Sequence, residues 1–290
     1  MQNVLQLENI ILQTLCAVKS EPARLNQIML KKLSLLTFGI LLVQHAHATV
    51  TLPFYEPFPT SYGNGTLLRA GNTAAVWDTG NTSTSLGAIV TNAAALGFSG
   101  LAVSNGSYGL QISGTPGSSR NAGAAFTPQT LTNSNPTLYA SFVLNVPTPP
   151  APTTNRLFAG LSTTPAATTT ASGVAGVWVD SSRRLLISKN SSSGSTAPGS
   201  TNTAAPATGN HLVVLRYQWN AGVNDDEVAL WLDPGALGLG EGSVPAATLS
   251  TTNGTDAAPL QSFWIFHPTT ASVAATILLE KFASAPPGRR

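Results

Sequence analysis

The sequence predicts an all-β fold, an antiparallel β-sandwich, on three observations. Apolar residues gather into short runs, and these runs recur roughly every ten to fifteen residues with turn residues between them. Beyond residue 48, almost no apolar pattern with a period of 3.6 residues lasts longer than two helical turns. Strand and helix patterns do not alternate, so nothing suggests a βαβ unit. We therefore expect one sandwich domain over residues 49–283, followed by a short tail at 284–290.

The apolar runs give the expected strands in order. The first is an edge strand because prolines break it, and the run at 211–219 is central because parts of both its faces are apolar. The run at 138–146 alternates most clearly, with Leu138, Ala140, Phe142, Leu144 and Val146 on one face. The expected strands cover residues 52–58, 74–77, 107–112, 122–126, 138–146, 156–161, 173–179, 185–189, 211–219, 227–232, 261–266 and 275–282.

The segments between these runs predict the connections. We expect 107–112 and 122–126 to form a hairpin through the turn Gly114–Gly117, and 173–179 and 185–189 to form a second through Asp180–Ser182. Residues 92–96 indicate one helical turn. The segment 190–210 has no apolar period, which fits either a mobile loop or an irregular excursion across a sheet face.

The segment Met29–Ala48 has the pattern of a secretory signal sequence. Lys31 and Lys32 precede the apolar run Leu33–Val43, and an A-x-A site ends at Ala48, after which we expect cleavage. As a helix the apolar run would span roughly 16 Å, about half the hydrocarbon core, so we expect no stable membrane span after signal removal. The protein is therefore expected to be exported, to the extracellular space or cell surface, with the periplasm as the alternative.

Residues 1–28 precede this signal as an N-terminal extension. Two interpretations stay open: a start codon assigned too early, or a long n-region that is removed with the signal. The chain's one cysteine, Cys16, lies in this extension, so the mature protein would have no disulfide, thiol nucleophile or cysteine metal site.

The charge beyond Ala48 is balanced, with ten acidic and ten basic residues. A nucleic-acid partner would normally require a basic patch, and none is visible in the sequence. Arg183, Arg184 and Lys189 come nearest, and we expect them to lie at a solvated strand edge.

Four segments carry a resemblance to a known family. Phe54–Phe58 with the following Gly63–Leu67 matches a "Y-E-x-F … G-x-L" opening, Ser99–Ala102 a "x-G-L-x" segment, Leu138–Phe142 a "Y-x-S-F" strand, and His211–Pro234 is the most specific. In this order they resemble the concanavalin A-like lectin/glucanase (LamG-like) jelly-roll domains of secreted bacterial proteins. The resemblance implies a jelly-roll sandwich over nearly the whole mature chain. It departs at Leu278–Phe282, where such domains often have "D-E-I-R-x-G", so the register of the last strand is left open.

The chemistry of a glycosidase is not apparent. Glucanases on this fold use E-x-D-x-x-E, which the chain lacks, and the consecutive Asp225, Asp226 and Glu227 would point to alternating faces of a strand. There is no G-x-S-x-G, and Gly97–Gly100 is only a near match. We expect His211 and His267 to be structural, without an identifiable partner. No catalytic residue, cofactor-binding residue or metal ligand is therefore assigned, and the protein is predicted not to be an enzyme.

Two binding chemistries remain as expectations. Asn224, Asp225 and Asp226 could supply oxygen ligands to calcium, but the sequence shows no second acidic cluster to complete the coordination. A carbohydrate platform would need exposed aromatic rings, and most candidates lie in apolar strands where we expect them to be core. These candidates are Tyr62, Trp77, Trp178, Trp219, Trp231 and Trp264.

The sequence thus predicts a secreted, non-catalytic module that binds carbohydrate or a matrix component, with polysaccharide or extracellular matrix as its partner. The first alternative is a structural cell-surface or matrix protein without a specific ligand. The second is a divergent glycosidase, which would require Glu56 to meet Asp78 or Asp226 in one cleft at catalytic spacing.

Overall fold

The computed structural model describes residues 49–62, 64, 77–78, 89–92, 96–98, 109–112, 120–130, 137–152, 155–165, 173–190, 209–234, 244–257, 259–267 and 276–285. The chain divides into two units, Met1–Ala46 and His47–Arg290. The predicted extension at 1–28 and the predicted signal sequence at 29–48 lie outside the described residues. Within them, no helix has the length and apolarity needed to cross a membrane.

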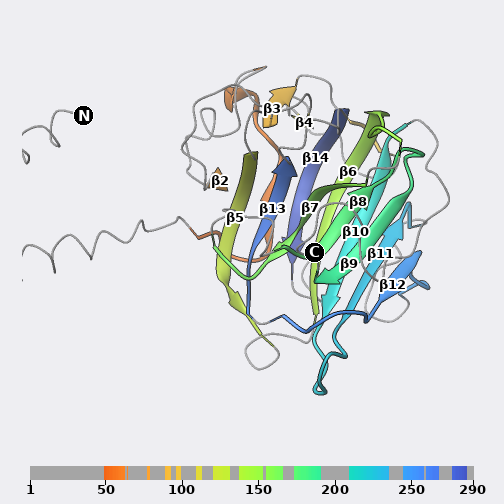
Figure 1. Cartoon of the computed structure of the whole chain (residues 1–290). Helices are drawn as coiled ribbons and strands as arrows, with labels where there is room; N and C mark the ends of the chain where they lie inside the picture. The colour runs from red at the N-terminus through yellow and green to blue at the C-terminus, as the bar shows by residue number, and fades with distance from the viewer. Residues whose placement is uncertain are drawn as a thin grey trace, which may run out of the picture. The chain divides into compact units, whose positions relative to one another are not determined.

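The described strands form two antiparallel sheets that pack face to face (Figure 1). The larger sheet has the order β12-β11-β10-β6-β14-β4-β3, with β1 also paired to β14. Its strands are β1 (Phe54–Glu56), β3 (Ile89–Asn92), β4 (Gly109–Ile112), β6 (Thr137–Thr148), β10 (His211–Gln218), β11 (Glu227–Leu232), β12 (Leu249–Thr251) and β14 (Thr276–Ala285). A single 3-10 turn, η1 (Thr60–Tyr62), follows β1 among the described residues.

The smaller sheet has the order β2-β5-β13-β7-β8-β9. Its strands are β2 (Trp77–Asp78), β5 (Arg120–Gln129), β7 (Arg156–Ser162), β8 (Gly173–Val179), β9 (Leu185–Asn190) and β13 (Leu260–His267). An isolated parallel bridge between Val50 and Phe126 attaches the start of the described chain to β5. The all-β antiparallel sandwich expected from the sequence is confirmed.

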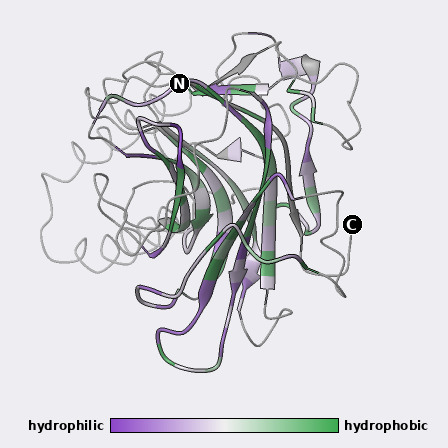
Figure 2. Ribbon diagram, turned by 90° about the vertical axis from the view of Figure 1, so that its right-hand side faces the viewer, coloured by the Kyte–Doolittle hydropathy of each residue, from purple (hydrophilic) through white to green (hydrophobic). Residues whose placement is uncertain are grey.

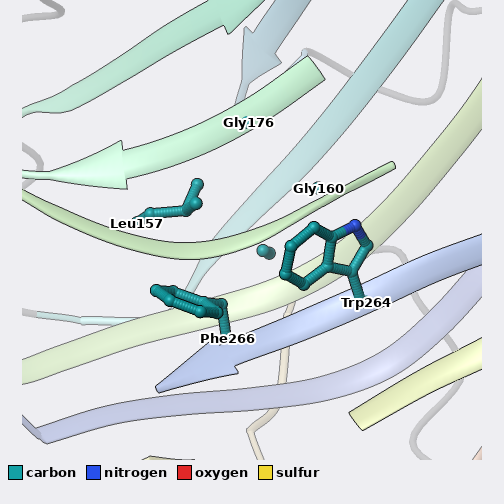
Figure 3. Close-up of a pocket in the computed structure, with 6 residues that line it drawn as sticks. Leu157, Gly160, Gly176, Trp264 and Phe266 are labelled. Carbon is teal, nitrogen blue, oxygen red and sulfur yellow. The ribbon is translucent and has the colours of Figure 1, made fainter. Parts of the chain in front are cut away.

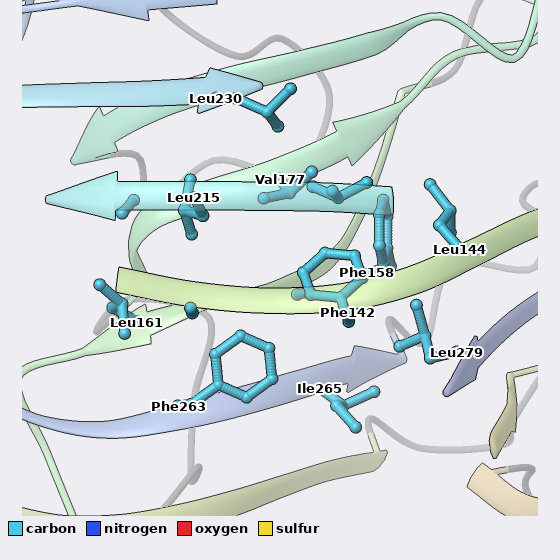
Figure 4. Close-up of a cluster of buried hydrophobic side chains, with 14 of the residues drawn as sticks. Phe142, Leu144, Phe158, Leu161, Val177, Leu215, Leu230, Phe263, Ile265 and Leu279 are labelled. Atoms are coloured by element: carbon cyan, nitrogen blue, oxygen red, sulfur yellow. The ribbon is translucent and has the colours of Figure 1, made fainter. Parts of the chain in front are cut away.

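The core lies between the sheets, where every second side chain of each strand points inward. On β6 the inward set is the one that the sequence pattern predicted, from Leu138 to Val146, and all its members are buried. Phe142 of this strand contacts Phe158 and Phe263 of the smaller sheet, with ring centroids 6.1 and 6.2 Å apart (Figure 4). The same alternation is visible along the strands as changes in hydropathy (Figure 2).

Most expected strands form close to their predicted ranges, and β8 and β11 match them residue for residue. The hairpin through Asp180 is confirmed. The Asp180 Oδ1 atom accepts hydrogen bonds from the backbone N–H groups of Ser182 (2.8 Å) and Arg184 (2.9 Å), which fixes the turn between β8 and β9. Arg183 takes a positive φ of 61° in this turn.

The predicted hairpin between 107–112 and 122–126 is wrong. β4 pairs with β14 and β3 in the larger sheet, whereas β5 pairs with β13 and β2 in the smaller one. The connection between them therefore crosses from one sheet to the other. Alternation within a strand identifies its buried face but does not identify its hydrogen-bonding partner.

Two short strands were not expected, β3 and β12. β3 includes Asn92, so the helical turn predicted over 92–96 does not begin there, and residues 93–95 lie outside the described residues. β14 resolves the open register of the last strand: it pairs with β6 on one side and with β4 and β1 on the other. It runs to Ala285.

Candidate functional site

The outward face of the larger sheet carries a row of polar side chains and one aromatic side chain on four adjacent strands, β6, β10, β11 and β12. Arg216 of β10 lies opposite Tyr139 of β6 and Ala229 of β11, and Gln218 lies opposite Thr137 and Glu227. These positions alternate with the buried Tyr217 and Leu215, so they face away from the core. We call the partly or fully exposed set the outer strip; its members are Thr137, Tyr139, Arg216, Gln218, Glu227 and Ser250.

Contacts within the outer strip hold its charged and aromatic groups in place. Arg216 Nη2 donates a hydrogen bond to Glu227 Oε2 at 2.5 Å, with side-chain exposures of 17% and 28%. The guanidinium carbon of Arg216 lies 5.4 Å from the ring centroid of Trp231, and the Tyr139 ring lies 6.4 Å from the same ring. Arg216 Nε is buried and has no hydrogen-bond partner. The strip thus offers a ring, a charge pair, an amide and hydroxyl groups within a few rungs of one sheet.

The other end of this face is closed. Leu212, Val214, Ala229 and Trp231 form a buried apolar cluster there, with Phe98, Tyr139 and Ala247 packed against it. The indole Nε1 of Trp231 donates to the carbonyl oxygen of Pro245 at 2.8 Å. The face is therefore most open towards the β10–β11 hairpin, whose tip residues 221–224 are exposed.

The outward face of the smaller sheet is apolar and closed. Leu157, Trp178, Leu186, Trp264 and Phe266 cluster on it, and each is at most 5% exposed. Trp264 and Phe266 meet edge to face beside Gly160 and Gly176, around a depression that has no room for a water molecule (Figure 3). Ligand pockets usually measure about 300–1,000 Å³. This depression is therefore not a ligand pocket, and its rings are not available for stacking.

The aromatic candidates from the sequence are all buried, as most were expected to be. Their exposed fractions lie between 1% and 5%, for Tyr62, Trp77, Trp178, Trp219, Trp231 and Trp264. Tyr139 lies between Leu138 and Ala140 of the predicted inward set, so the alternation implies an outward position for it, but it was not among the expected platform residues. The runs at 138–146 and 227–232 both alternate. Their outward positions, taken together, were the sequence signal that could have identified the outer strip.

The predicted calcium ligands lie in the β10–β11 connection, and the fold brings Asp256 to them. Asp225, Asp226 and Asp256 each offer a carboxylate oxygen, and these oxygens lie within 4.8 Å of one another. Most of their oxygens already have protein donors. Asp226 accepts from Tyr217 Oη (2.6 Å) and from the Asn220 N–H (2.8 Å), and Asn224 Oδ1 accepts from the Asp256 N–H (3.3 Å).

Lys189 enters this same cluster, contrary to the expectation that it lies at a solvated edge. Its side chain is fully buried, and Nζ donates to Asp256 Oδ1 at 2.7 Å and to the Asp226 carbonyl oxygen at 3.1 Å. Arg183 and Arg184 are also engaged, Arg183 with the carbonyl oxygens of Val146 and Pro147 and Arg184 with Asp180. The three basic residues therefore do not form a shared patch.

Glu56 is buried at the opposite side of the sandwich. Its carboxylate accepts hydrogen bonds from the Phe58 N–H (2.7 Å), Tyr62 Oη (3.1 Å) and Trp77 Nε1 (3.1 Å). Burial raises the pKa of Glu56, and the three donors offset only part of that effect. The same burial, with the neighbouring Glu56 charge, raises the pKa of Tyr62.

Of the two carboxylate pairs considered for a glycosidase, the pair that the structure describes, Glu56 and Asp226, does not meet. Glu56 ends β1 and Asp226 precedes β11, with β14, β6 and β10 between these strands. Four strand spacings of about 4.8 Å place them about 19 Å apart, well beyond the roughly 5–9 Å that the reaction needs. Asp78 lies in β2, but its side chain is outside what the structure describes.

His211 has a partner that the sequence analysis did not identify. Its Nδ1 lies 2.7 Å from Asp233 Oδ2, and Asp233 Oδ1 accepts from the Leu212 N–H at 2.8 Å. The pair joins the start of β10 to the end of β11, which fits the structural role expected for His211 and supplies the partner that the sequence did not reveal. His267 ends β13.

No family model matches the chain, and no curated protein is similar enough to count as a relative. Among solved structures, a Trypanosoma rangeli sialidase is 15% identical with a TM-score of 0.38, over 63% of this chain and 26% of its own. The globular domain of T. cruzi calreticulin is 14% identical with a TM-score of 0.44, over 80% of this chain and 87% of its own. The carbohydrate recognition domain of Emp46p is 8% identical with a TM-score of 0.42, over 80% and 97%. This chain thus spans about a quarter of the sialidase chain.

Nothing that these proteins bind or cleave is transferred to this chain at such identities and TM-scores. The strand order itself identifies the fold class. Two antiparallel sheets stack with the first and last described strands, β1 and β14, side by side in the larger one. This is an all-β antiparallel sandwich, and the concanavalin A-like jelly roll that the four sequence segments resemble stays a prediction.

Proposed function

We propose that this protein binds carbohydrate through the outer strip, without catalysing a reaction. The observation that carries the proposal is the partly exposed Tyr139 ring, which lies where the closed end of the sheet face meets its open end, beside the Arg216–Glu227 pair and the Gln218 amide. The ligand class that we propose is a polysaccharide or a glycan of an extracellular matrix.

The chemistry of the outer strip suits a sugar ring. Pyranose rings present an apolar C–H face that stacks on aromatic rings, and hydroxyl groups at their edges that need donors and acceptors. Tyr139 supplies a ring, Arg216 and Gln218 supply donors, and Glu227 supplies acceptors. Adjacent strands lie about 4.8 Å apart, so these groups spread over a shallow surface, which favours a polymer over a small molecule held in a pocket.

The outward face of the smaller sheet supports this choice by contrast. It has more aromatic residues, but its rings are buried and its depression is lined by apolar groups. A sugar at that position would leave its hydroxyl groups without partners, which is costly in a closed site.

A binding role is favoured over hydrolysis because the strip itself contains one carboxylate, that of Glu227. Retaining and inverting glycosidases both need two. The pair formed by Glu56 and Asp226 is too widely separated to serve.

The test is retention on polysaccharides, using the purified chain from Thr49 onward on insoluble and gel-embedded polysaccharides and a glycan array. Wild type is expected to be retained by at least one polysaccharide. Tyr139→Ala should weaken that affinity by about tenfold, the equivalent of losing one stacking contact. Tyr55→Ala is the matched control, since Tyr55 is 54% exposed on β1 outside the strip.

Two results would contradict the proposal. Uniform failure of wild type to bind would favour the alternative of a structural surface or matrix protein without a specific ligand. Equal loss of affinity in Tyr139→Ala and Tyr55→Ala would place any binding elsewhere.

We also propose that the protein is exported and cleaved after Ala48, which would place the outer strip outside the cytoplasm. The pattern of Lys31, Lys32 and Leu33–Val43 supports this. Expression of the full chain in a secreting host should yield a product whose N-terminal residue is Thr49, read by mass spectrometry. A product that keeps residues 1–48 and stays with the cells would contradict export.

A further inference from the structure

The side chain of Lys189 places a buried ammonium group between the two sheets. It lies in β9, the edge strand of the smaller sheet, which packs against β11 and β12 of the larger sheet. Its two acceptors lie in the connections that follow two strands of the larger sheet, β10 and β12. Asp226 comes immediately before β11, and Asp256 lies between β12 and β13.

Around this ammonium group the fold gathers the oxygens that a hard cation would take. Asp225, Asp226 and Asp256 present carboxylate oxygens within 4.8 Å of one another, and the Asp226 carbonyl adds a fourth oxygen. Carboxylate and carbonyl oxygens from separate loops are typical calcium ligands. Here, however, a positive group of the chain itself is already bound to two of the oxygens.

The hydrogen bonds show what this charge organises. Asp256 Oδ1 accepts from Lys189 Nζ and from the Asp226 N–H at 3.0 Å, and Asp256 Oδ2 accepts from the Asn224 N–H at 2.5 Å. Asp256 is thereby tied to two backbone positions of the β10–β11 connection. The Asp225 Oδ1 atom, by contrast, is buried without a hydrogen-bond partner.

The energetics favour a fixed position for this ammonium. A buried charge is tolerated only when paired and hydrogen-bonded, and removing one partner of a buried pair is strongly destabilising. Burial acts to raise the pKa of Asp256, but the Lys189 hydrogen bond, the two backbone N–H groups and the Lys189 charge outweigh it and hold that pKa below its ordinary value.

We infer that the Lys189 ammonium is the built-in cation of this loop cluster. It joins the β10–β11 connection to the segment before β13 as a bound divalent ion would, so that these loops keep their geometry without a metal. The inference is independent of the proposed function, although the hairpin that it holds borders the outer strip.

The test compares cation dependence in two proteins, wild type and Lys189→Met, which keeps the apolar part of the side chain as far as Cε and removes the ammonium group. Thermal unfolding is followed in EDTA, in CaCl₂ and in NaCl of equal ionic strength. Wild type should unfold at the same temperature in all three. Lys189→Met should unfold about 10 °C lower in EDTA, as expected for a broken buried ion pair in a domain of this size, and CaCl₂ should restore part of the loss where NaCl does not.

The control is Arg184→Met, which removes a cation from an ion pair whose arginine side chain is 43% exposed. It should shift the midpoint by no more than about 2 °C and show no calcium response. If Lys189→Met does not fold, the cycle of Asp256→Asn and Lys189→Arg replaces it. Asp256→Asn should then unfold at a lower temperature than wild type. Lys189→Arg should keep most of the wild-type stability, because it keeps the positive charge.

Three outcomes would overturn the inference. One is a wild type stabilised by calcium or destabilised by EDTA, which would mean that the cluster takes a metal beside the lysine. Another is a Lys189→Met protein as stable as wild type. The third is a destabilised Lys189→Met that no cation stabilises, which would leave Lys189 as an ordinary packing residue.

Discussion

Glu56 of the larger sheet accepts a hydrogen bond from the indole Nε1 of Trp77 in the smaller sheet, at 3.1 Å. At the other lateral side of the sandwich, Lys189 of the smaller sheet donates to Asp226 and Asp256, which follow β10 and β12 of the larger sheet. Among the described residues, each of these two sides thus has a buried ionisable residue whose side chain bonds to a group beyond its own sheet. A sandwich without a disulfide, as this chain would be once residues 1–48 are removed, relies on such cross-links together with its core.

The Glu56 carboxyl should make stability fall as the pH rises. Because its pKa in the folded chain lies above the ordinary 4.5, the folded state holds a proton that the unfolded state has released. The unfolding free energy from this group is therefore greatest below about pH 4.5 and decreases as the pH rises through the folded pKa. Glu56→Gln should flatten this dependence, measured by urea unfolding between pH 4 and pH 8.

Glu227→Gln is the control for that experiment, because it removes the same charge from a partly exposed position. The interpretation fails if Glu56→Gln and wild type show parallel pH profiles over this range.

Asp256 should contribute in the opposite direction. Its folded pKa lies below the ordinary 3.8, so the stabilisation that it provides is complete above that value and is lost as the pH falls through the folded pKa. Asp256→Asn should have a lower unfolding free energy than wild type at pH 6, and this difference should shrink in acid. Chemical unfolding of both proteins at pH 6, 4 and 3 measures it. A difference that stays constant down to pH 3 would contradict the prediction.

The Tyr217 hydroxyl should contribute more to stability than an exposed hydroxyl does. It donates to Asp226 Oδ2 at 2.6 Å and accepts from the Ala257 N–H at 3.0 Å, inside the core beside Trp219. Tyr217→Phe leaves both partners buried and incompletely satisfied, at a cost of about 1–3 kcal/mol. Urea unfolding of Tyr217→Phe and of Tyr55→Phe, where the ring is largely exposed, tests this; equal values for the two would show that the network contributes nothing.

The sequence predicted local features well and distant pairings poorly. The alternation on β6 identified its buried face because strand geometry alone imposes that period. The burial of Lys189 was missed because its partner Asp256 lies 67 residues away, and the burial of a charge depends on that partner. The His211–Asp233 contact has the same origin, at a separation of 22 residues. The outer strip needed the register between β6, β10 and β11, which no pattern within one strand supplies.

Gly160 should not tolerate a side chain, because β7 and β8 pack closely at this position. A Cβ atom there would lie 3.0 Å from the Ala175 carbonyl oxygen, 3.1 Å from the Gly176 Cα and 3.2 Å from the Val174 carbonyl oxygen. All three are backbone atoms of the paired strand, so relief would require a shift of the sheet, at a cost of about 1–3 kcal/mol.

A Cβ at Gly97 would meet no atom within 4 Å. Gly97→Ala should therefore be neutral or slightly stabilising through the unfolded chain. Thermal unfolding of both variants measures the contrast, and a Gly160→Ala protein as stable as Gly97→Ala would show that the two strands can separate freely.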